Sequence, residues 1–226
     1  LPTQHKQDQV LFSLEWDGGK TLIATEDMPS FEDNIWSIYL QNTGVSKFAN
    51  TTLSKMLAGK QVSIYPTIKA TTHGITGQST PKDLETALQL MYLYVADPRF
   101  DAEEYETGIQ QIKAVLPNLL NTPDFKFQKF VNDKLYAGNE RAVVIDEEVM
   151  SKASLETIER VYRELYKNAA GATLTIVGNV DLETLKPLVE KYIGSLPKGK
   201  KPAGVNTDNL ISMAKGEVMN DVKIAM

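Results

Sequence analysis

The residue types that most often carry enzyme chemistry are scarce in this sequence. Its 226 residues include no cysteine and two histidines, His5 and His73. The absence of cysteine excludes disulfides, thiol nucleophiles and cysteine-ligated zinc or iron–sulfur sites. No second histidine stands near His73 at the spacing of a zinc-ligand pair. We therefore expect His73 to be a satisfied polar histidine at a strand end, and His5 to lie in a frayed terminus.

Two pairs of adjacent carboxylates have the composition of a general acid and base. They are Glu103 with Glu104 and Glu147 with Glu148. Each pair stands at the expected start of a helix, where the helix dipole favours negative charge. We therefore assign both pairs to helix stabilisation. Ser195 lacks the G-x-S-x-G context of a hydrolase nucleophile and has no plausible histidine base.

Glycines and aromatic residues provide no ligand motif either. No glycine in the chain belongs to a phosphate-binding G-x-x-x-x-G-K-[ST] loop. Three neighbouring phenylalanines are expected to be core residues: Phe125, Phe127 and Phe130. The sequence therefore predicts no catalytic, cofactor-binding or metal-ligating residue in this chain.

Composition excludes several classes of protein. An apolar share of 42% and a charged share of 23% are ordinary for a globular protein. The formal net charge of −5 argues against a nucleic-acid binder, which needs a basic face. No apolar run approaches the roughly 20 residues that cross a bilayer. The sequence begins without an initiator methionine or a signal-peptide core, so we expect it to be cut from a longer protein.

The first third of the chain combines strand and helix signals. We predict strands over residues 10–14 and 61–70, and helices over residues 31–41 and 53–57. Pro66 is expected to interrupt the ladder of the second strand. Residues 73–78 either continue that strand or turn out of it.

The middle of the chain is helical. Thr80, Asp101 and Ser154 each suit the N-cap of a helix, and a further helix is expected around residues 127–135. Pro117 should kink the helix that follows Asp101 or end its first part.

The last part of the chain changes character. A strand over residues 173–177 is followed by a helix for which Asp181 suits the N-cap. After Pro197 comes a segment rich in glycine, lysine and proline, which we interpret as a solvated linker. Residues 216–226 could begin another strand. We therefore divide the chain into one module, residues 1–200, and a linker with the start of a following module, residues 201–226. The expected order of elements is strands, several helices, a strand and a helix. This order predicts an α+β fold.

Several sequence blocks, in order, resemble the insulinase/pitrilysin-type zinc metallopeptidases. Residues 75–85 resemble the G-x-S-x-P-K-D-L-E turn of this family, and residues 98–101 its P-R-F-D motif. Further blocks that resemble the family are residues 1–3 (the end of its opening strand), 27–60, 155–166, 173–179 and 192–197. Together they resemble the non-catalytic module in the C-terminal half of a bacterial long-chain member.

The resemblance implies an α+β module in which a mixed, mostly antiparallel sheet packs against helices on one face, as in mitochondrial processing peptidase-like metallohydrolases. Copies of the module surround a peptide-binding chamber. Active copies bind zinc through H-x-x-E-H on their first long helix. Overlaying that helix on residues 31–44 puts Ile35, Ile38 and Tyr39 roughly where the two histidines and the glutamate of the motif would be. Because isoleucine supplies neither a zinc ligand nor a general base, the resemblance implies an inactive module without metal.

The resulting hypothesis is a fragment of a zinc metallopeptidase that forms part of the substrate chamber and binds peptide. Its partner would be the N-terminal catalytic half of the parent protein, which would carry the zinc. The alternatives are a non-enzymatic structural or assembly subunit and a free-standing peptide-binding domain. An H-x-x-E-H motif upstream of Leu1 would distinguish the first two. The relatives suggest a bacterial periplasm or cell envelope, and a cytoplasmic location stays open.

Overall fold

The computed structural model describes residues 8–217, 219, 222 and 223. Short 3₁₀ turns follow β1 and precede α3: η1 (Gly19–Leu22), η2 (Thr25–Phe31) and η3 (Pro81–Asp83), with η4 (Thr207–Asn209) near the C-terminus. The strands and α-helices, in chain order, are β1 (Val10–Asp17), α1 (Asp33–Asn42), α2 (Asn50–Met56), β2 (Val62–Ile68), β3 (Thr72–Ser79), α3 (Leu84–Ala96), α4 (Ala102–Asn121), α5 (Pro123–Leu135), α6 (Glu147–Lys152), α7 (Leu155–Leu165), β4 (Thr173–Gly178) and α8 (Leu182–Tyr192).

The four described strands form one antiparallel sheet in the order β2-β3-β1-β4. The predicted α+β class is confirmed. In β1 the side chains of Val10, Phe12, Leu14 and Trp16 are buried, and the intervening side chains are exposed or half-buried. This two-residue period is that of a strand with only one face covered.

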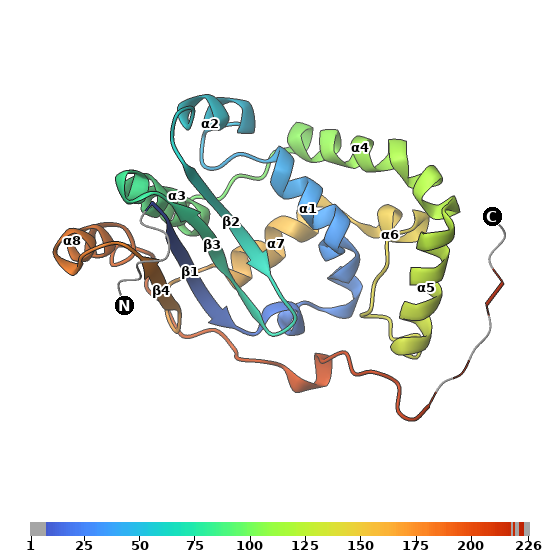
Figure 1. The fold of residues 1–226 in the computed structure, drawn as a ribbon. Coiled ribbons are helices and arrows are strands. Elements are labelled where there is room, and N and C mark those ends of the chain that lie inside the picture. The colour runs from blue at the N-terminus through green and yellow to red at the C-terminus, as the bar shows by residue number, and fades with distance from the viewer. Residues whose placement is uncertain (1–7, 218, 220–221, 224–226) are drawn as a thin grey trace.

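Helices cover one face of the sheet (Figure 1). α3 contacts β2 and β3, and the buried residues of α3 and α7 join those of the sheet in the larger hydrophobic cluster. From the residue after α7, the Tyr166 hydroxyl donates to the carbonyls of Thr67 (2.7 Å) and Gly74 (3.2 Å) in the β2–β3 hairpin. The helical layer is therefore joined to the sheet by hydrogen bonds as well as by apolar packing.

A second, smaller cluster lies where α1 meets α4 and α6. It contains Ile35 of α1, Ile145, Met150 of α6, and three residues of α4: Ile109, Ile112 and Leu116. Beyond it, α5 lies at the end of the molecule away from the sheet (Figure 1). α5 has no buried residue.

The structure bears on two expectations about prolines. Pro66 lies inside β2 and pairs with Ile75, so the ladder continues through it. Proline is tolerated there because β2 is an edge strand and needs no donor on its outer side. α4 continues as one helix through Pro117, so the alternative that the helix ends at this residue is wrong, while the alternative of a kink stays a prediction.

The expectation that the three phenylalanines are core residues is wrong for Phe127. Its side chain is 46% exposed on α5, and only Phe125 packs against the smaller cluster. The apolar spacing predicted the helix correctly, but α5 contacts the rest of the described chain too little to bury its apolar side.

Residues 73–78 turn out of the preceding strand and form β3, so β2 and β3 make a hairpin. Asp101 and Ser154 cap α4 and α7 as predicted. Thr80 caps a 3₁₀ turn, η3, from which α3 continues. The strand predicted for residues 216–226 and the opening-strand end at residues 1–3 lie outside the described residues.

The segment after Pro197 is not a free linker. It runs along one side of the molecule from the end of α8 to α5 (Figure 1). The Asn206 amide donates to the Thr21 hydroxyl at 3.0 Å, and the Asn209 side chain donates to the Thr21 carbonyl at 2.8 Å. The Ala214 amide donates to the Leu135 carbonyl of α5 at 2.7 Å. Composition predicted that this segment is largely irregular, and its only described helical element is the short 3₁₀ turn η4, but composition gave no signal of these anchoring contacts.

Candidate functional site: helix α1 and the uncovered face of the sheet

Helix α1 stands where the family resemblance places the zinc-binding helix. Its N-cap is Glu32, whose carboxylate accepts hydrogen bonds from the amides of Asn34 (2.9 Å) and Ile35 (3.2 Å). Burial of Glu32 raises the pKa of its carboxyl group. The carboxylate of Glu32 is therefore used for the helix end, which accounts for two of the amides that a helix leaves without partners.

The three residues at the positions expected for the H-x-x-E-H motif pack into the protein. Ile35 is fully buried, and Ile38 is half-buried against the same smaller cluster. Tyr39 is buried, and its hydroxyl donates to the Arg99 carbonyl at 3.0 Å. Burial raises the pKa of Tyr39 well above its usual value, so the phenolate that could ligate a metal is disfavoured. These side chains of α1 therefore pack in the protein interior.

His73 is a satisfied buried histidine, as predicted. Its Nε2 lies 2.9 Å from the Leu165 carbonyl, and Nδ1 accepts from the Gly19 amide at 3.3 Å. A carbonyl can only accept, so Nε2 carries the proton. The ring stacks on Trp16 at 5.7 Å between ring centroids. Both ring nitrogens are therefore used within the fold, and burial lowers the pKa of His73.

The other predicted assignments can be placed on the structure. Glu103 and Glu104 lie in the first turn of α4, and Glu147 and Glu148 lie in the first turn of α6. The Ser195 hydroxyl donates to the Lys191 carbonyl at 2.6 Å. Within the residues that the structure describes, no three histidine or carboxylate side chains gather closely enough to hold a metal ion. The expectation of a metal-free module stays a prediction.

The face of the sheet opposite the helices is the surface that remains available for binding a ligand. We call it the uncovered face. Its side chains form three rows across the four strands. They are Ser63, Gln78, Leu11 and Val177; Tyr65, Thr76, Ser13 and Thr175; and Thr67, Gly74, Glu15 and Thr173. Three large apolar side chains are exposed there: Tyr65 (46%), Leu11 (45%) and Val177 (41%).

Two carboxylates lie on the uncovered face: Glu15 within the three rows, and the exposed Asp17 at the end of β1. Glu15 accepts from Lys69 at 2.8 Å and from the Thr72 hydroxyl at 2.9 Å. The hydrogen bond from Lys69 lowers the pKa of Glu15. The rest of the face is hydroxyl-rich, amide or apolar. The Thr76 hydroxyl donates to the Phe12 carbonyl at 3.0 Å, which restricts its rotamer.

The outer edge of β2 presents backbone groups in a definite order. The Lys69 amide donates to the Thr72 carbonyl, which makes these two residues a hydrogen-bonded pair. Such pairs recur at every second residue of an antiparallel ladder, so Thr67 and Tyr65 also direct their backbone groups toward β3. The intervening residues, Ile64, Pro66 and Ile68, direct theirs outward. Pro66 offers only its carbonyl.

A hollow of about 550 Å³ adjoins the beginning of β2. Its lining comes from both strands of the hairpin and from the residues before β1. It is mixed in character and includes Lys60, Asp8, Gln61, Gln78 and Ser63.

The arrangement offers binding chemistry: a sheet edge, exposed apolar side chains and hydroxyl groups. Sequence reasoning predicted that the module binds peptide, but it did not identify the strand or the face that would do so. The sequence contained part of the information that identifies the face. Residues 10–17 alternate between large apolar and polar side chains except at Leu11, an apolar residue in an outward position.

Comparison with protein families supports this architecture. Residues 152–218 match the family described as "Peptidase M16 inactive domain". This match extends past residue 200, where we placed the end of the module, so that boundary stays a prediction. No curated protein sequence matches the chain. In the described part of the chain, none of the helices is both long and apolar enough to span a bilayer.

Solved structures of proteases share the fold. The periplasmic protease PqqL from Escherichia coli matches with a TM-score of 0.72 and 16% identity, over 94% of this chain and 23% of PqqL. A protease from Helicobacter pylori matches with a TM-score of 0.69 and 11% identity, over 90% of this chain and 49% of that protein. The peptidase M16 inactive domain from Pseudomonas fluorescens matches with a TM-score of 0.66 and 15% identity, over 91% and 50%.

These matches confirm the predicted resemblance. The chain has the fold of the M16 peptidases, and residues 152–218 carry the sequence signature of their inactive domain. It spans between about a quarter and a half of the length of these proteases.

Proposed function

We propose that this chain is a non-catalytic module of an M16-type zinc peptidase that holds an extended peptide on the outer edge of β2 and on the uncovered face. The zinc and the general base are carried by another module of the parent protein. The observation that carries this proposal has two parts: the residues of α1 at the expected motif positions are packed into the protein, and helices cover only one side of the sheet (Figure 1).

The chemistry of peptide capture suits this surface. An extended peptide can add to an open sheet edge through main-chain hydrogen bonds, while alternate side chains meet the neighbouring strand. The outward backbone groups of Ile64 and Ile68 each supply a donor and an acceptor. Pro66 removes one donor, and the flanking Lys60 and Lys69 place charge at both ends of the strand. Both features limit uncontrolled pairing of edge strands.

The test combines peptide binding with hydrogen exchange at single backbone amides. A fluorescein-labelled, nine-residue peptide rich in valine and threonine is titrated into the chain, and binding is followed by anisotropy. Exchange should slow at the outward amides of Ile64 and Ile68. By the same two-residue alternation, the outward amides of β4 are those of Leu174 and Ile176, and they serve as the internal control. Binding that protects only the β4 amides, or no binding at all, would contradict the proposal.

Metal content and cleavage are measured on the same sample. After incubation with excess zinc and desalting, the chain should retain well under one zinc per molecule, and the peptide should stay intact. One tightly bound zinc per chain, or cleavage of the peptide, would show that the module has its own catalytic centre.

A further inference from the structure

The side chains of β2 that share the uncovered face carry no charge. They are Ser63, Tyr65 and Thr67, with Tyr65 in the centre of the three. The ionisable side chains nearest in sequence, Lys60 and Lys69, stand outside the two ends of the strand. Lys69 is paired with Glu15, and Lys60 lies 3.9 Å from Asp83.

Tyr65 occupies the position where a bound peptide would come closest. Its backbone groups are directed toward β3, so on the outer side of β2 it stands at a non-hydrogen-bonded position. Side chains in such pairs approach more closely than those in hydrogen-bonded pairs. The ring is 46% exposed, which leaves apolar area for a cross-strand neighbour.

We infer that Tyr65 selects the peptide: the residue opposite Tyr65 is uncharged and is apolar or aromatic. This inference rests on the proposed binding of peptide at the edge of β2. A cross-strand aromatic or β-branched neighbour gains contact with the ring, and a charged residue at the same place loses water without gaining a partner. Tyr65 is therefore a specificity residue for the substrate class.

The experiment uses four nine-residue peptides that differ only at the central position, which carries Val, Phe, Asp or Lys. Binding to the chain is measured by competition anisotropy. The Val and Phe peptides should bind about two- to fivefold more tightly than the Asp and Lys peptides, the range expected for one cross-strand pair. Equal binding of all four peptides would overturn the inference while leaving the proposed function intact. Failure of every peptide to bind would instead remove the proposed function.

A charge substitution separates selection from a merely structural role. In the Tyr65→Lys variant the Asp peptide should become the best ligand of the four, and in Tyr65→Phe the original order should persist. Thr175→Lys is the matched control, because it adds the same charge in the same row of the uncovered face, on β4. If Thr175→Lys inverts the preference as Tyr65→Lys does, or if Tyr65→Lys leaves it unchanged, Tyr65 does not select the peptide.

Discussion

At the scale of single residues, two side chains that resemble catalytic groups are used inside the fold. His73 donates from Nε2 and accepts at Nδ1, and its ring stacks on Trp16. The Tyr39 hydroxyl donates to a main-chain carbonyl. Each is buried and hydrogen-bonded, so each contributes to stability and to a unique packing arrangement. The residue types alone would have permitted a functional assignment. The sequence spacing already argued against one for His73, and the observed hydrogen-bond partners agree with that interpretation.

The buried state of His73 predicts acid sensitivity. Burial lowers its pKa in the folded chain, while the hydrogen bond to Leu165 and the charges of Asp17 and Glu15 act in the opposite direction. The unfolded chain takes up a proton near pH 6.5, and the folded chain does so only at lower pH. The free energy of unfolding should therefore decrease as the pH falls below about 7, by at most about 1.4 kcal/mol per pH unit.

Urea denaturation at pH 7.5 and pH 5.5 measures this effect, with His73→Gln as the comparison. The variant should be less stable at both values, but the contribution of residue 73 to the pH dependence should disappear. Both proteins contain Glu32, whose raised pKa changes stability with pH in the opposite direction. Its contribution is therefore the same in both proteins and cancels in the comparison. If the two proteins show the same pH dependence, His73 is not the acid-sensitive group.

At the scale of elements, the caps decide where helices begin. Asp181 accepts from the Thr184 amide at 2.7 Å and from the Thr184 hydroxyl at 2.9 Å at the start of α8. The sequence predicted this cap, because aspartate before an amphipathic run is a helix-start signal. Its strength can be tested without disturbing the core, because α8 contains no fully buried residue.

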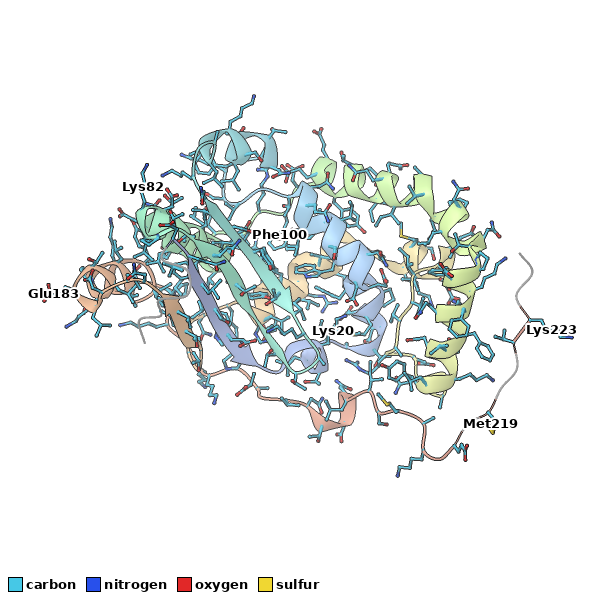
Figure 2. All side chains as sticks on the ribbon, in the orientation of Figure 1. Lys20, Lys82, Phe100, Glu183, Met219 and Lys223 are labelled. Atoms are coloured by element: carbon cyan, nitrogen blue, oxygen red, sulfur yellow. The ribbon has the colours of Figure 1, made fainter. Side chains whose placement is uncertain are left out.

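Replacing Asp181 with alanine should lower the free energy of unfolding by about 1 kcal/mol, since the first turn of α8 loses its side-chain acceptor. Thermal or urea denaturation followed by circular dichroism provides the measurement. Glu183→Ala is the control, because Glu183 lies in the same turn but points away from the body of the protein (Figure 2). An equal loss of stability in both variants would assign the effect to charge in the first turn.

At the scale of the whole molecule, Arg141 joins segments that are far apart in sequence. Its guanidinium group donates to the Lys20 carbonyl (2.7 Å), the Thr25 hydroxyl (3.0 Å) and the Asn209 carbonyl (3.1 Å). Arg141 therefore anchors the C-terminal segment to the loop that follows β1. Further along this segment, Met219 is 87% exposed (Figure 2).

Arg141→Ala should release the C-terminal segment from the body of the protein. Hydrogen exchange of residues 205–213 should become faster, because the Asn209 carbonyl loses its donor while the exchange of β1 and β3 changes little. Arg160→Ala serves as the control. That residue is 60% exposed and pairs with Asp27, so its loss removes a surface ion pair of small energetic value. Unchanged exchange in residues 205–213 would show that Arg141 is not needed to hold the segment.

The sequence by itself determined the α+β class, most element positions, the caps at Asp101 and Asp181 and the family resemblance. These features depend on short-range patterns of apolar residues and on local hydrogen bonds, which a single segment encodes. The tertiary structure decided the rest. The continuation of β2 through Pro66, the exposure of Phe127 and the anchoring of residues 198–214 depend on which segments become neighbours. Those neighbours are distant in the chain, so no local pattern could reveal which face of the sheet stays open.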